Sequence, residues 1–369
     1  LEFRRVLFRS LDTCRRLVAA VHERGMRIVL DAVFNHCGIG HWAFQDVLAR
    51  GADSPYVNWF YVQDLPVEPD PVSPNYATCG GAHYLPQWNV HNPEVREHHF
   101  DVTRRWIAEG IDGWRLDVPY SMNQNFWRRF RRIVKGESTD LYIVAEHWEV
   151  ATDWVRGDIA DGAMNYPLRD LILQFVADRT ITASAFAEGV RDLWRQLPTS
   201  AIPGMLNLLG SHDTERLLTR CQGDRRRLRQ ALALLVTSPG VPMIYYGDEV
   251  GLTGGNDPGC RGCMPWDTER WDTEVLDVTR GLLAIRAAHP TLVEPDDDLR
   301  AVDESLLVRR RGAGPDRVVV AVNVGSGDRA VPPALLEPDL RPAFGPSPAP
   351  GEPPTVRAND VLILTPSGR

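Results

Sequence analysis

The chain has 369 residues, of which 43% are hydrophobic and 24% are charged, a composition typical of a soluble globular protein with one large domain and a smaller one. Its formal net charge of -8 excludes the broad basic surface that nucleic-acid-binding proteins carry. No apolar run reaches the length that a membrane span needs.

The first ten residues, LEFRRVLFRS, do not share the pattern of the chain that follows. They have neither the apolar stretch nor the cleavage site of a signal peptide. We interpret residues 1–10 as non-native read-through joined to a truncated gene. The missing signal peptide and the acidic composition predict a cytoplasmic protein.

From Ser10 onward the chain alternates between helical and extended patterns. Ser10 caps a predicted helix that ends near Gly25, and a buried strand follows over 26–36. Further strands are predicted at 111–118, 141–148, 162–165, 204–213 and 241–249. The helices between and after them are predicted near 93–109, 123–135, 167–177, 182–196, 224–237 and 273–288. Such alternation predicts right-handed parallel units and an α/β fold.

The polar residues of these strands gather at their C-terminal ends, which is typical of (β/α)8 barrels. A Rossmann sheet is the alternative, but no GxGxxG motif follows the first strand. The sequence therefore predicts a (β/α)8 TIM barrel over 11–289. Because a barrel needs eight units and six strands are recognisable, we expect the first two strands to lie upstream of this chain.

Two further regions stand apart from the alternating pattern. Residues 37–92 are far longer than an ordinary loop and predict an inserted subdomain. They are rich in aromatic residues, whose flat rings suit the apolar faces of sugars, although most of these rings would form the subdomain's own core. After His289, extended runs punctuated by proline and glycine predict a C-terminal antiparallel β domain over 290–369.

Four strand ends carry side chains suited to catalysis. They are Asp31, Asn35 and His36 in DAVFNH, Arg115 and Asp117 in GWRLDV, Glu146 and Trp148 in AEHW, and His212 and Asp213 in GSHD. Neighbouring strands of one barrel would bring these groups together at its mouth. Arg115 and Asp117 lie two residues apart and share one face of their strand. Taken alone, the pair fits either a structural salt bridge or half of an active site.

The six cysteines offer little chemistry. Only Cys260 and Cys263 form a CxxC motif, and neither a second pair nor histidines at ligand spacing accompany them. Free cysteines in a reducing compartment fit this distribution better than a structural zinc site.

Four motifs in this order resemble those of the α-amylase superfamily, glycoside hydrolase family 13, from about residue 11 to the end of the chain. DGAMNYPLRD, LGSHDTERLLT and IYYGDEVGLTGGNDPGCRGCMPWD are similar to segments of the neopullulanase, cyclomaltodextrinase and maltogenic amylase group. LPQWN at 85–89 departs from that group's usual form. The resemblance implies a barrel with a long excursion after its third strand and a C-terminal β domain.

The resemblance also implies retaining hydrolysis of α-glucosidic bonds in maltodextrins, cyclodextrins or related α-glucans, accompanied by transglycosylation. Asp117 would be the nucleophile and Glu146 the general acid and then base, which needs a raised pKa. Asp213 would be the third carboxylate, which stabilises the oxocarbenium-like transition state. The remaining implied roles are ion pairing to Asp117 by Arg115, sugar-hydroxyl binding by His36 and His212, and an acceptor-side wall at Trp148.

The implied chemistry requires no cofactor. In some relatives the counterpart of Asn35 binds calcium, so Asn35 is a candidate calcium ligand. Taken alone, His36 fits a strand-end histidine bonded to the backbone better than it fits a substrate-binding residue. The expected partner is an α-glucan oligosaccharide or cyclodextrin, with neither nucleic acid nor membrane, and the full-length form is expected to be a homodimer.

Two alternative functions stay open. One is a catalytically weak or inactive truncated barrel that only binds glucan, and the other is a disaccharide isomerase or glucanotransferase on the same residues. All three carboxylates are present, which argues against the first, and the neopullulanase-like segment at 244–267 argues against the second. Because a barrel without two strands exposes apolar edges, we expect this chain alone to be unstable or weakly active.

Overall fold

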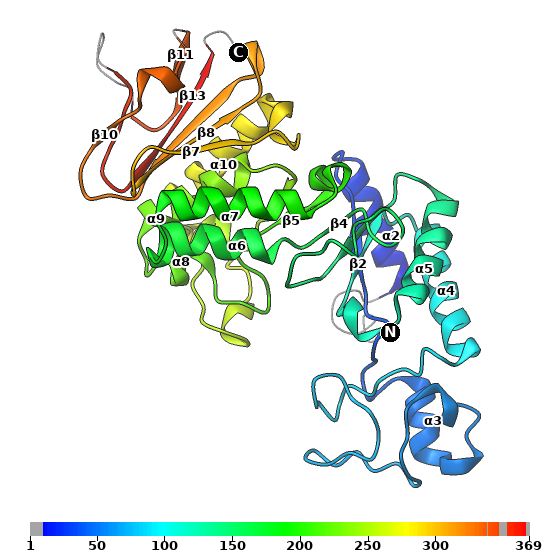
Figure 1. Cartoon of the computed structure of the whole chain (residues 1–369). Coiled ribbons are helices and arrows are strands. Elements are labelled where there is room, and N and C mark those ends of the chain that lie inside the picture. The colour runs from blue at the N-terminus through cyan, green and yellow to red at the C-terminus, as the bar shows by residue number, and fades with distance from the viewer. Residues whose placement is uncertain (1–9, 338, 347–352, 367–369) are drawn as a thin grey trace. The chain divides into compact units, whose positions relative to one another are not determined.

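A computed structural model of the chain describes residues 10–337, 339–346 and 353–366 (Figure 1). The chain divides into two compact units. Unit 1 contains the described residues up to His147 together with Arg156–Asp161, and unit 2 contains Trp148–Val155 together with the described residues from Gly162 onward. The expected read-through lies outside the described residues except for Ser10. The expected domain boundaries at 11–289 and 290–369 stay a prediction.

Unit 1 is built on a parallel sheet with strand order β1–β2–β3. The strands are β1 (Val29–Ala32), β2 (Gly113–Leu116) and β3 (Tyr142–Ala145), and the helices that precede them are α2 (Leu11–His22), α4 (Pro93–Ala108) and α5 (Gln124–Glu137). Helices α4 and α5 lie side by side next to β2 (Figure 1). The predicted alternation of helices and parallel strands is present in this unit.

The helices of unit 1 begin where side-chain caps are available. The Ser10 hydroxyl accepts a hydrogen bond from the Thr13 amide, and the Asn92 side chain accepts one from the Glu94 amide. These bonds satisfy backbone donors that the first turn of a helix leaves free. Phe126 and Trp127 of α5 are buried, which anchors this strongly amphipathic helix to the unit.

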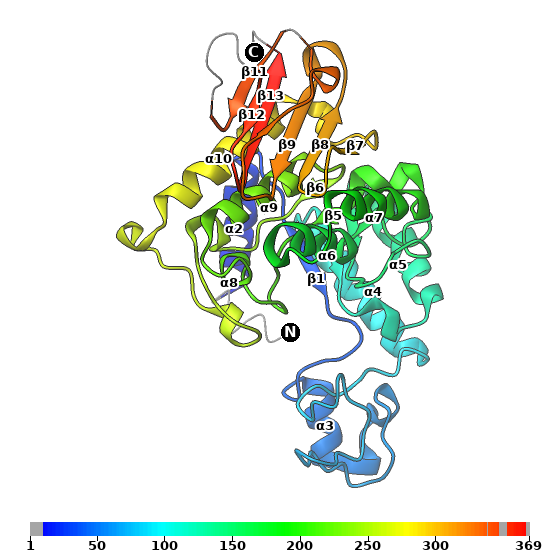
Figure 2. The same cartoon turned by 60° about the vertical axis from the view of Figure 1, so that its left-hand side comes forward.

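The excursion over 37–92 folds around its own aromatic core. It contains α3 (Trp42–Arg50) and the short 3-10 helices η1 (Gly51–Asp53) and η2 (Val57–Trp59), and it is seen as a separate lobe of unit 1 in Figure 2. The ring of Phe60 stacks on Trp88 with centroids 4.7 Å apart, and Phe44 packs edge-on against Phe60. Trp42 and Tyr84 stay half-exposed. Most of the rings therefore form the lobe's core.

Unit 2 continues the alternation with three very short strands. They are β4 (Gly162–Ala163), β5 (Leu206–Asn207) and β6 (Val241–Pro242), and the helices are α6 (Tyr166–Leu173) with its π-helical extension η4 (Gln174–Asp178), α7 (Ala183–Gln196), α8 (Leu217–Arg220), α9 (Arg225–Thr237) and α10 (Thr273–Ala288). β5 and β6 pair in parallel. β6 is shorter than predicted and ends at Pro242, which has no N–H for the ladder.

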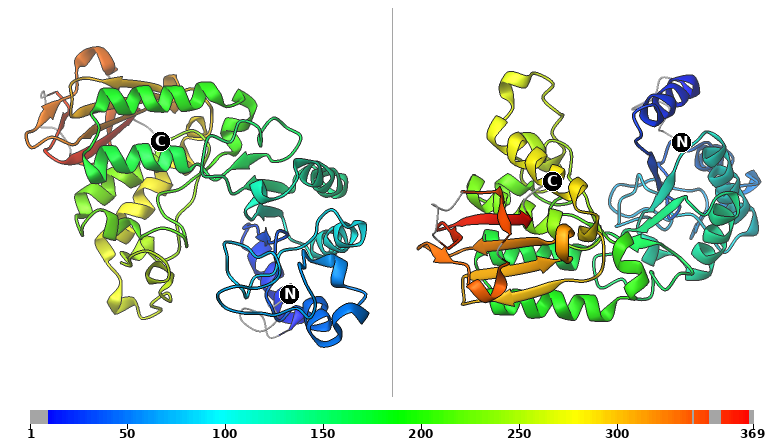
Figure 3. Two further views of the ribbon diagram at one scale, coloured as in Figure 1. Left: turned by 60° about the horizontal axis from the view of Figure 1, so that its bottom comes forward. Right: turned by 90° about the horizontal axis from the view of Figure 1, so that it is seen from above.

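The predicted C-terminal antiparallel domain is confirmed. A five-stranded antiparallel sheet has the order β11–β13–β9–β8–β7. Its strands are β7 (Asp298–Ala301), β8 (Leu306–Arg311), β9 (Val318–Asn323), β11 (Leu340–Phe344) and β13 (Asp360–Pro366), and β10 (Arg329–Ala330) pairs with β12 (Thr355–Val356). Helix α7 lies along β7 and β8, and α9 packs against β9 and β13 (Figure 3).

Short 3-10 helices complete the backbone: η3 (Pro119–Ser121), η5 (Thr199–Gly204), η6 (Asp248–Val250), η7 (Gly259–Arg261), η8 (Thr268–Arg270), η9 (Pro290–Leu292), η10 (Gly314–Asp316) and η11 (Pro333–Leu335). Among the described residues, no helix combines the length and the apolar character that crossing a membrane requires.

Candidate active site

Backbone pairing sets Asp117 and Glu146 next to each other. Leu116 at the end of β2 lies opposite Ala145 at the end of β3. The ladder continues for one step, because the Glu146 amide donates to the carbonyl oxygen of Leu116 at 3.0 Å. Neighbouring strands lie about 4.8 Å apart, so the parallel register alone brings the two carboxylate-bearing residues together.

The guanidinium of Arg115 lies between three carboxylates. Its Nη1 is 2.5 Å from Oδ1 of Asp117 and 3.1 Å from Oδ1 of Asp31, and its Nη2 is 2.7 Å from Oε1 of Glu146. The Asp31 contact follows from the register, in which Asp31 of β1 is the direct partner of Arg115. The ion pair expected from the spacing of Arg115 and Asp117 is therefore present, within a larger cluster.

Burial and charge act in opposite directions on this guanidinium. Burial lowers the pKa of Arg115, but the carboxylates of Asp31, Glu146 and Asp117 outweigh burial and raise it above its ordinary value. Arg115 is therefore held in its cationic form beside these carboxylates. This cation lies beside Asp117, the residue that the resemblance assigns as the nucleophile.

The residue after Asp117 has an unusual backbone. Val118 has φ 36° and ψ 51°, in the left-handed region that a β-branched residue rarely adopts. In this conformation its amide donates to Oε2 of Glu146 at 3.0 Å. Glu146 is buried, with one oxygen on Arg115 and the other on this amide. Backbone strain of this kind concentrates at functional sites.

His36 and Asn35 follow the end of β1 and join the excursion to the carboxylate cluster. His36 forms an isolated antiparallel bridge with Gln87, and the side-chain Nε2 of Gln87 donates to Oδ1 of Asn35 at 3.0 Å. Burial lowers the pKa of His36, and the charge of Asp117 partly opposes this effect. The pKa of His36 therefore lies below the ordinary value for histidine, and His36 is within electrostatic reach of Asp117.

Asn35 is the residue for which the resemblance implies calcium binding. Its side-chain oxygen already accepts the hydrogen bond from Gln87. Among the residues that the structure describes, no three or more His, Cys, Asp or Glu side chains gather closely enough to hold a metal ion. Calcium at Asn35 stays a prediction of the resemblance, and no step of the chemistry below uses it.

A second group of predicted residues lies in unit 2. Nε2 of His212 is 3.2 Å from Oδ2 of Asp213, and Nη2 of Arg261 is 3.2 Å from Oδ1 of Asp213. Arg261 also donates through Nε to the carbonyl oxygen of His212 at 3.1 Å. Sequence reasoning missed Arg261. The sequence feature that could have indicated Arg261 is its position between the two cysteines of the CxxC motif.

Trp148 belongs to the same unit as His212 and Asp213. Its indole stacks on the buried ring of Tyr166 with centroids 3.8 Å apart and an angle of 12°. The Tyr166 hydroxyl lies 3.2 Å from Oγ of Ser211, the residue before His212. Trp148 stays 41% exposed, so part of its ring is open to a ligand.

The structure thus places the predicted residues in two groups. Unit 1 holds Asn35, His36, Arg115, Asp117 and Glu146 together with Asp31, and unit 2 holds Trp148, His212 and Asp213.

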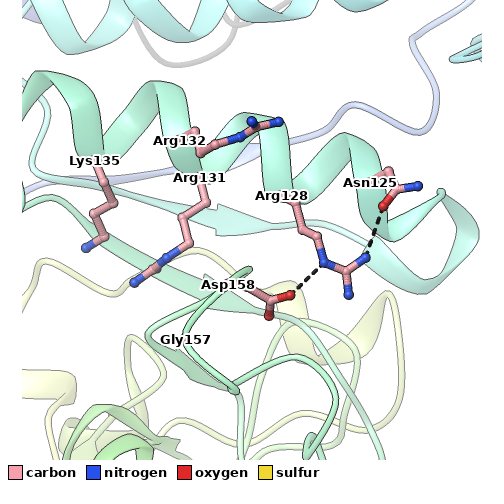
Figure 4. A pocket seen from close by; sticks show the side chains of 7 residues that line it. All are labelled: Asn125, Arg128, Arg131, Arg132, Lys135, Gly157 and Asp158. Atoms are coloured by element: carbon pink, nitrogen blue, oxygen red, sulfur yellow. Dashed lines mark hydrogen bonds and ion pairs between the residues drawn. The ribbon is translucent and has the colours of Figure 1, made fainter.

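A basic hollow elsewhere in unit 1 is a weaker candidate (Figure 4). It is lined by the cationic face of α5 and by a facing loop, with the side chains of Asn125, Arg128, Arg131, Arg132, Lys135 and Asp158 and with Gly157. Nε of Arg128 is 2.6 Å from Asp158, and Arg131 and Lys135 both pair with Asp161. Arg128, Arg131 and Lys135 are therefore already paired with carboxylates, and the hollow holds neither a nucleophile nor a carboxylate pair.

The chain matches a known protein family over most of its length. The model of the family described as "Alpha amylase, catalytic domain" matches residues 7–280. The chain belongs to the alpha-amylase family. Its members of known structure have a TIM barrel followed by a C-terminal β domain, in agreement with the predicted fold class.

Among solved structures, the chain is similar to the cyclic alpha-maltosyl-(1→6)-maltose hydrolase of Arthrobacter globiformis in its ligand-free form. The TM-score is 0.90 and the sequences are 50% identical, over 98% of this chain and 79% of that protein. This likeness extends the alpha-amylase family assignment beyond the barrel to the C-terminal domain.

Two curated relatives fall in the group that the sequence motifs indicated. A cyclomaltodextrinase of Geobacillus thermopakistaniensis (strain MAS1) is 42% identical over 328 residues, which is 88% of this chain and 56% of that protein. The intracellular maltogenic amylase of Bacillus subtilis (strain 168) is 43% identical over 287 residues, 78% of this chain and 48% of that protein. The chain spans about half the length of the curated relatives it matches.

Proposed function

We propose that this chain carries the catalytic machinery of a retaining glycoside hydrolase that cleaves α-glucosidic bonds in maltodextrins, cyclodextrins or related α-glucans. The observation that carries the proposal is the position of Arg115 between Asp117 and Glu146 at the ends of adjacent parallel strands. Retaining enzymes need two carboxyl groups about 5–5.5 Å apart, one ionised and one that exchanges protons.

In the first step, the ionised carboxylate of Asp117 attacks the anomeric carbon and forms a covalent glycosyl ester. The bond from that carbon to the glycosidic oxygen breaks, and Glu146 gives its proton to the departing oxygen. In the second step, Glu146 takes a proton from water, which attacks the anomeric carbon and releases Asp117. Two inversions at one carbon retain the α configuration.

The remaining residues of the site are assigned to binding the substrate and stabilising its transition state. We propose that Asp213 stabilises the oxocarbenium-like transition state and that His36 and His212 bind sugar hydroxyls. Trp148, held by Tyr166, would stack on the acceptor sugar.

The relatives favour hydrolysis over the isomerase and glucanotransferase alternatives and over a barrel that only binds glucan. The 50% identity to a cyclic alpha-maltosyl-(1→6)-maltose hydrolase adds cyclic α-glucans with 1,6-bonds to the proposed substrates. A cytoplasmic location is proposed on the name of the relative called intracellular maltogenic amylase.

The test is product analysis on maltotriose, β-cyclodextrin, pullulan and cyclic α-maltosyl-(1→6)-maltose, with Asp117→Asn as the inactive control. Proton NMR of the first product reports its anomeric form. The proposal expects α-configured sugars that disappear in the variant. An initial β product, or turnover that Asp117→Asn leaves intact, would contradict it.

A further inference from the structure

A buried ion pair in unit 2 has no part in the chemistry above. Nη1 of Arg216 lies 3.1 Å from Oδ1 of Asp248, and the two side chains are 0% and 6% exposed. Removing two charges from water is costly, and well-packed apolar residues often replace such a pair without loss of stability. Arg216 lies three residues after Asp213, so this pair is close in sequence to a residue of the proposed site.

Arg216 contacts two other segments besides its own. Its backbone amide donates to the carbonyl oxygen of Gly254 at 3.0 Å, and Nη1 donates to the carbonyl oxygen of Tyr246 at 2.7 Å. The guanidinium carbon lies 4.6 Å from the ring centroid of Tyr245 and 4.9 Å from that of Tyr246. Cation–π contacts of this kind are strongest where the cation is desolvated, as here.

The two tyrosines extend these contacts to the loop that contains the CxxC motif. The hydroxyl of Tyr246 donates to the carbonyl oxygen of Gly262 at 3.0 Å. The hydroxyl of Tyr245 donates to the carbonyl oxygen of Cys260 at 3.4 Å. These two carbonyls flank Arg261 on either side, so the tyrosines fix the backbone from which the Arg261 side chain extends.

Arg261 completes the connection to the proposed site. Its Nη2 is 3.2 Å from Oδ1 of Asp213, and its Nε donates to the carbonyl oxygen of His212 at 3.1 Å. The thiol of Cys260 donates to the same carbonyl oxygen at 3.0 Å. The segment that carries His212 and Asp213 is thus held by the loop that the tyrosines fix.

We propose that Arg216 is a positioning residue for Asp213. It acts through Tyr245 and Tyr246 on the loop at 259–262, and through Arg261 on the Asp213 carboxylate, while Asp248 fixes the guanidinium against both rings. The inference rests on the proposed function, in which Asp213 stabilises the transition state. A carboxylate displaced by about 1 Å loses much of that stabilisation, although the sugar still binds.

Two variants test the connection at different points. Arg216→Lys keeps the charge but removes the flat guanidinium that lies against the rings of Tyr245 and Tyr246. Tyr246→Phe removes only the hydroxyl tether at a partly exposed ring and leaves the buried charges intact, so it serves if the first variant does not fold. The matched control is Arg309→Lys, because Arg309 forms a buried ion pair with Asp297 at 2.9 Å in the same unit.

The readouts are kcat and KM on β-cyclodextrin and hydrogen exchange of peptides covering 209–216 and 257–263. Both variants are expected to lower kcat about tenfold or more with KM within threefold of wild type, and to speed exchange in both peptides about tenfold. Arg309→Lys should change neither. Equal effects in Arg309→Lys, or an unchanged kcat with unchanged exchange, overturn the proposal. If the wild-type protein hydrolyses no α-glucan, the proposed function is overturned. The exchange rates of the two peptides then decide by themselves whether Arg216 positions the segment that carries Asp213.

Discussion

Nη2 of Arg115 lies 2.7 Å from Oε1 of Glu146, so the proposed general acid rests in an ion pair. The same guanidinium contacts Asp117 through Nη1. In the proposed mechanism Glu146 protonates the departing oxygen, so it must carry a proton when the glycosidic bond breaks.

Glu146→Gln should therefore affect substrates according to their leaving group. With a sugar as leaving group, loss of the proton donor is expected to lower kcat about 10²–10⁴-fold. A 2,4-dinitrophenyl maltoside departs without protonation, so its first step should stay fast while deglycosylation slows. Rapid-quench kinetics would then show a burst of dinitrophenol. An equal loss on both substrates would contradict the acid role.

Asp117→Asn and Asp31→Asn form a matched pair, because both carboxylates contact Nη1 of Arg115. Only Asp117 lies where the ladder of β2 brings it beside Glu146. Asp117→Asn should lower kcat about 10⁴-fold or more, as loss of a nucleophile does in other enzymes. Asp31→Asn should cost less than about tenfold. Steady-state kinetics on maltotriose decides, and similar losses in the two variants would remove Asp117 from the nucleophile's role.

Arg115→Met should destabilise unit 1 because it leaves three carboxylates facing one another without a cation. The Arg115 side chain is only 12% exposed, and breaking a buried pair by removing one partner costs about 3–5 kcal/mol. Urea unfolding followed by fluorescence measures the loss. Arg104→Met is the control, since its ion pairs with Glu97 and Asp101 are solvent-exposed and should contribute little.

Asp248 should make stability depend on pH in the opposite sense to an ordinary aspartate. Burial raises the pKa of Asp248 to about 7 although Arg216 opposes the shift, whereas an unfolded aspartate titrates at about 3.9. Between these values the folded state binds the extra proton. The contribution of this group is therefore fully present below about pH 4 and is lost as the pH rises through about 7.

Asp248→Asn removes this dependence. The stability difference between wild type and variant should change in favour of the variant by on the order of 1 kcal/mol per pH unit from about pH 4 to about pH 7. Urea unfolding across that range measures it, with Asp297→Asn as the control for a second buried pair. A difference that stays flat with pH would show that Asp248 is ionised throughout.

The sequence by itself determined the elements and the residue types at their ends. Ser10 and Asn92 cap helices where their side chains reach a free amide two or three residues on, which is a local interaction. Period-two alternation put Arg115 and Asp117 on one face of a strand, and the ion pair followed. Four such strand ends in order were enough to indicate the family.

Only the tertiary structure decided which distant groups meet. The pairing of Leu116 with Ala145 places Glu146 on the guanidinium that Asp117 already uses, and nothing local in either strand encodes that register. The contacts of Arg261 with Asp213 and of Arg216 with Asp248 join segments more than thirty residues apart. Such contacts come from the packing of loops onto a rigid frame, where burial and backbone geometry select the partners.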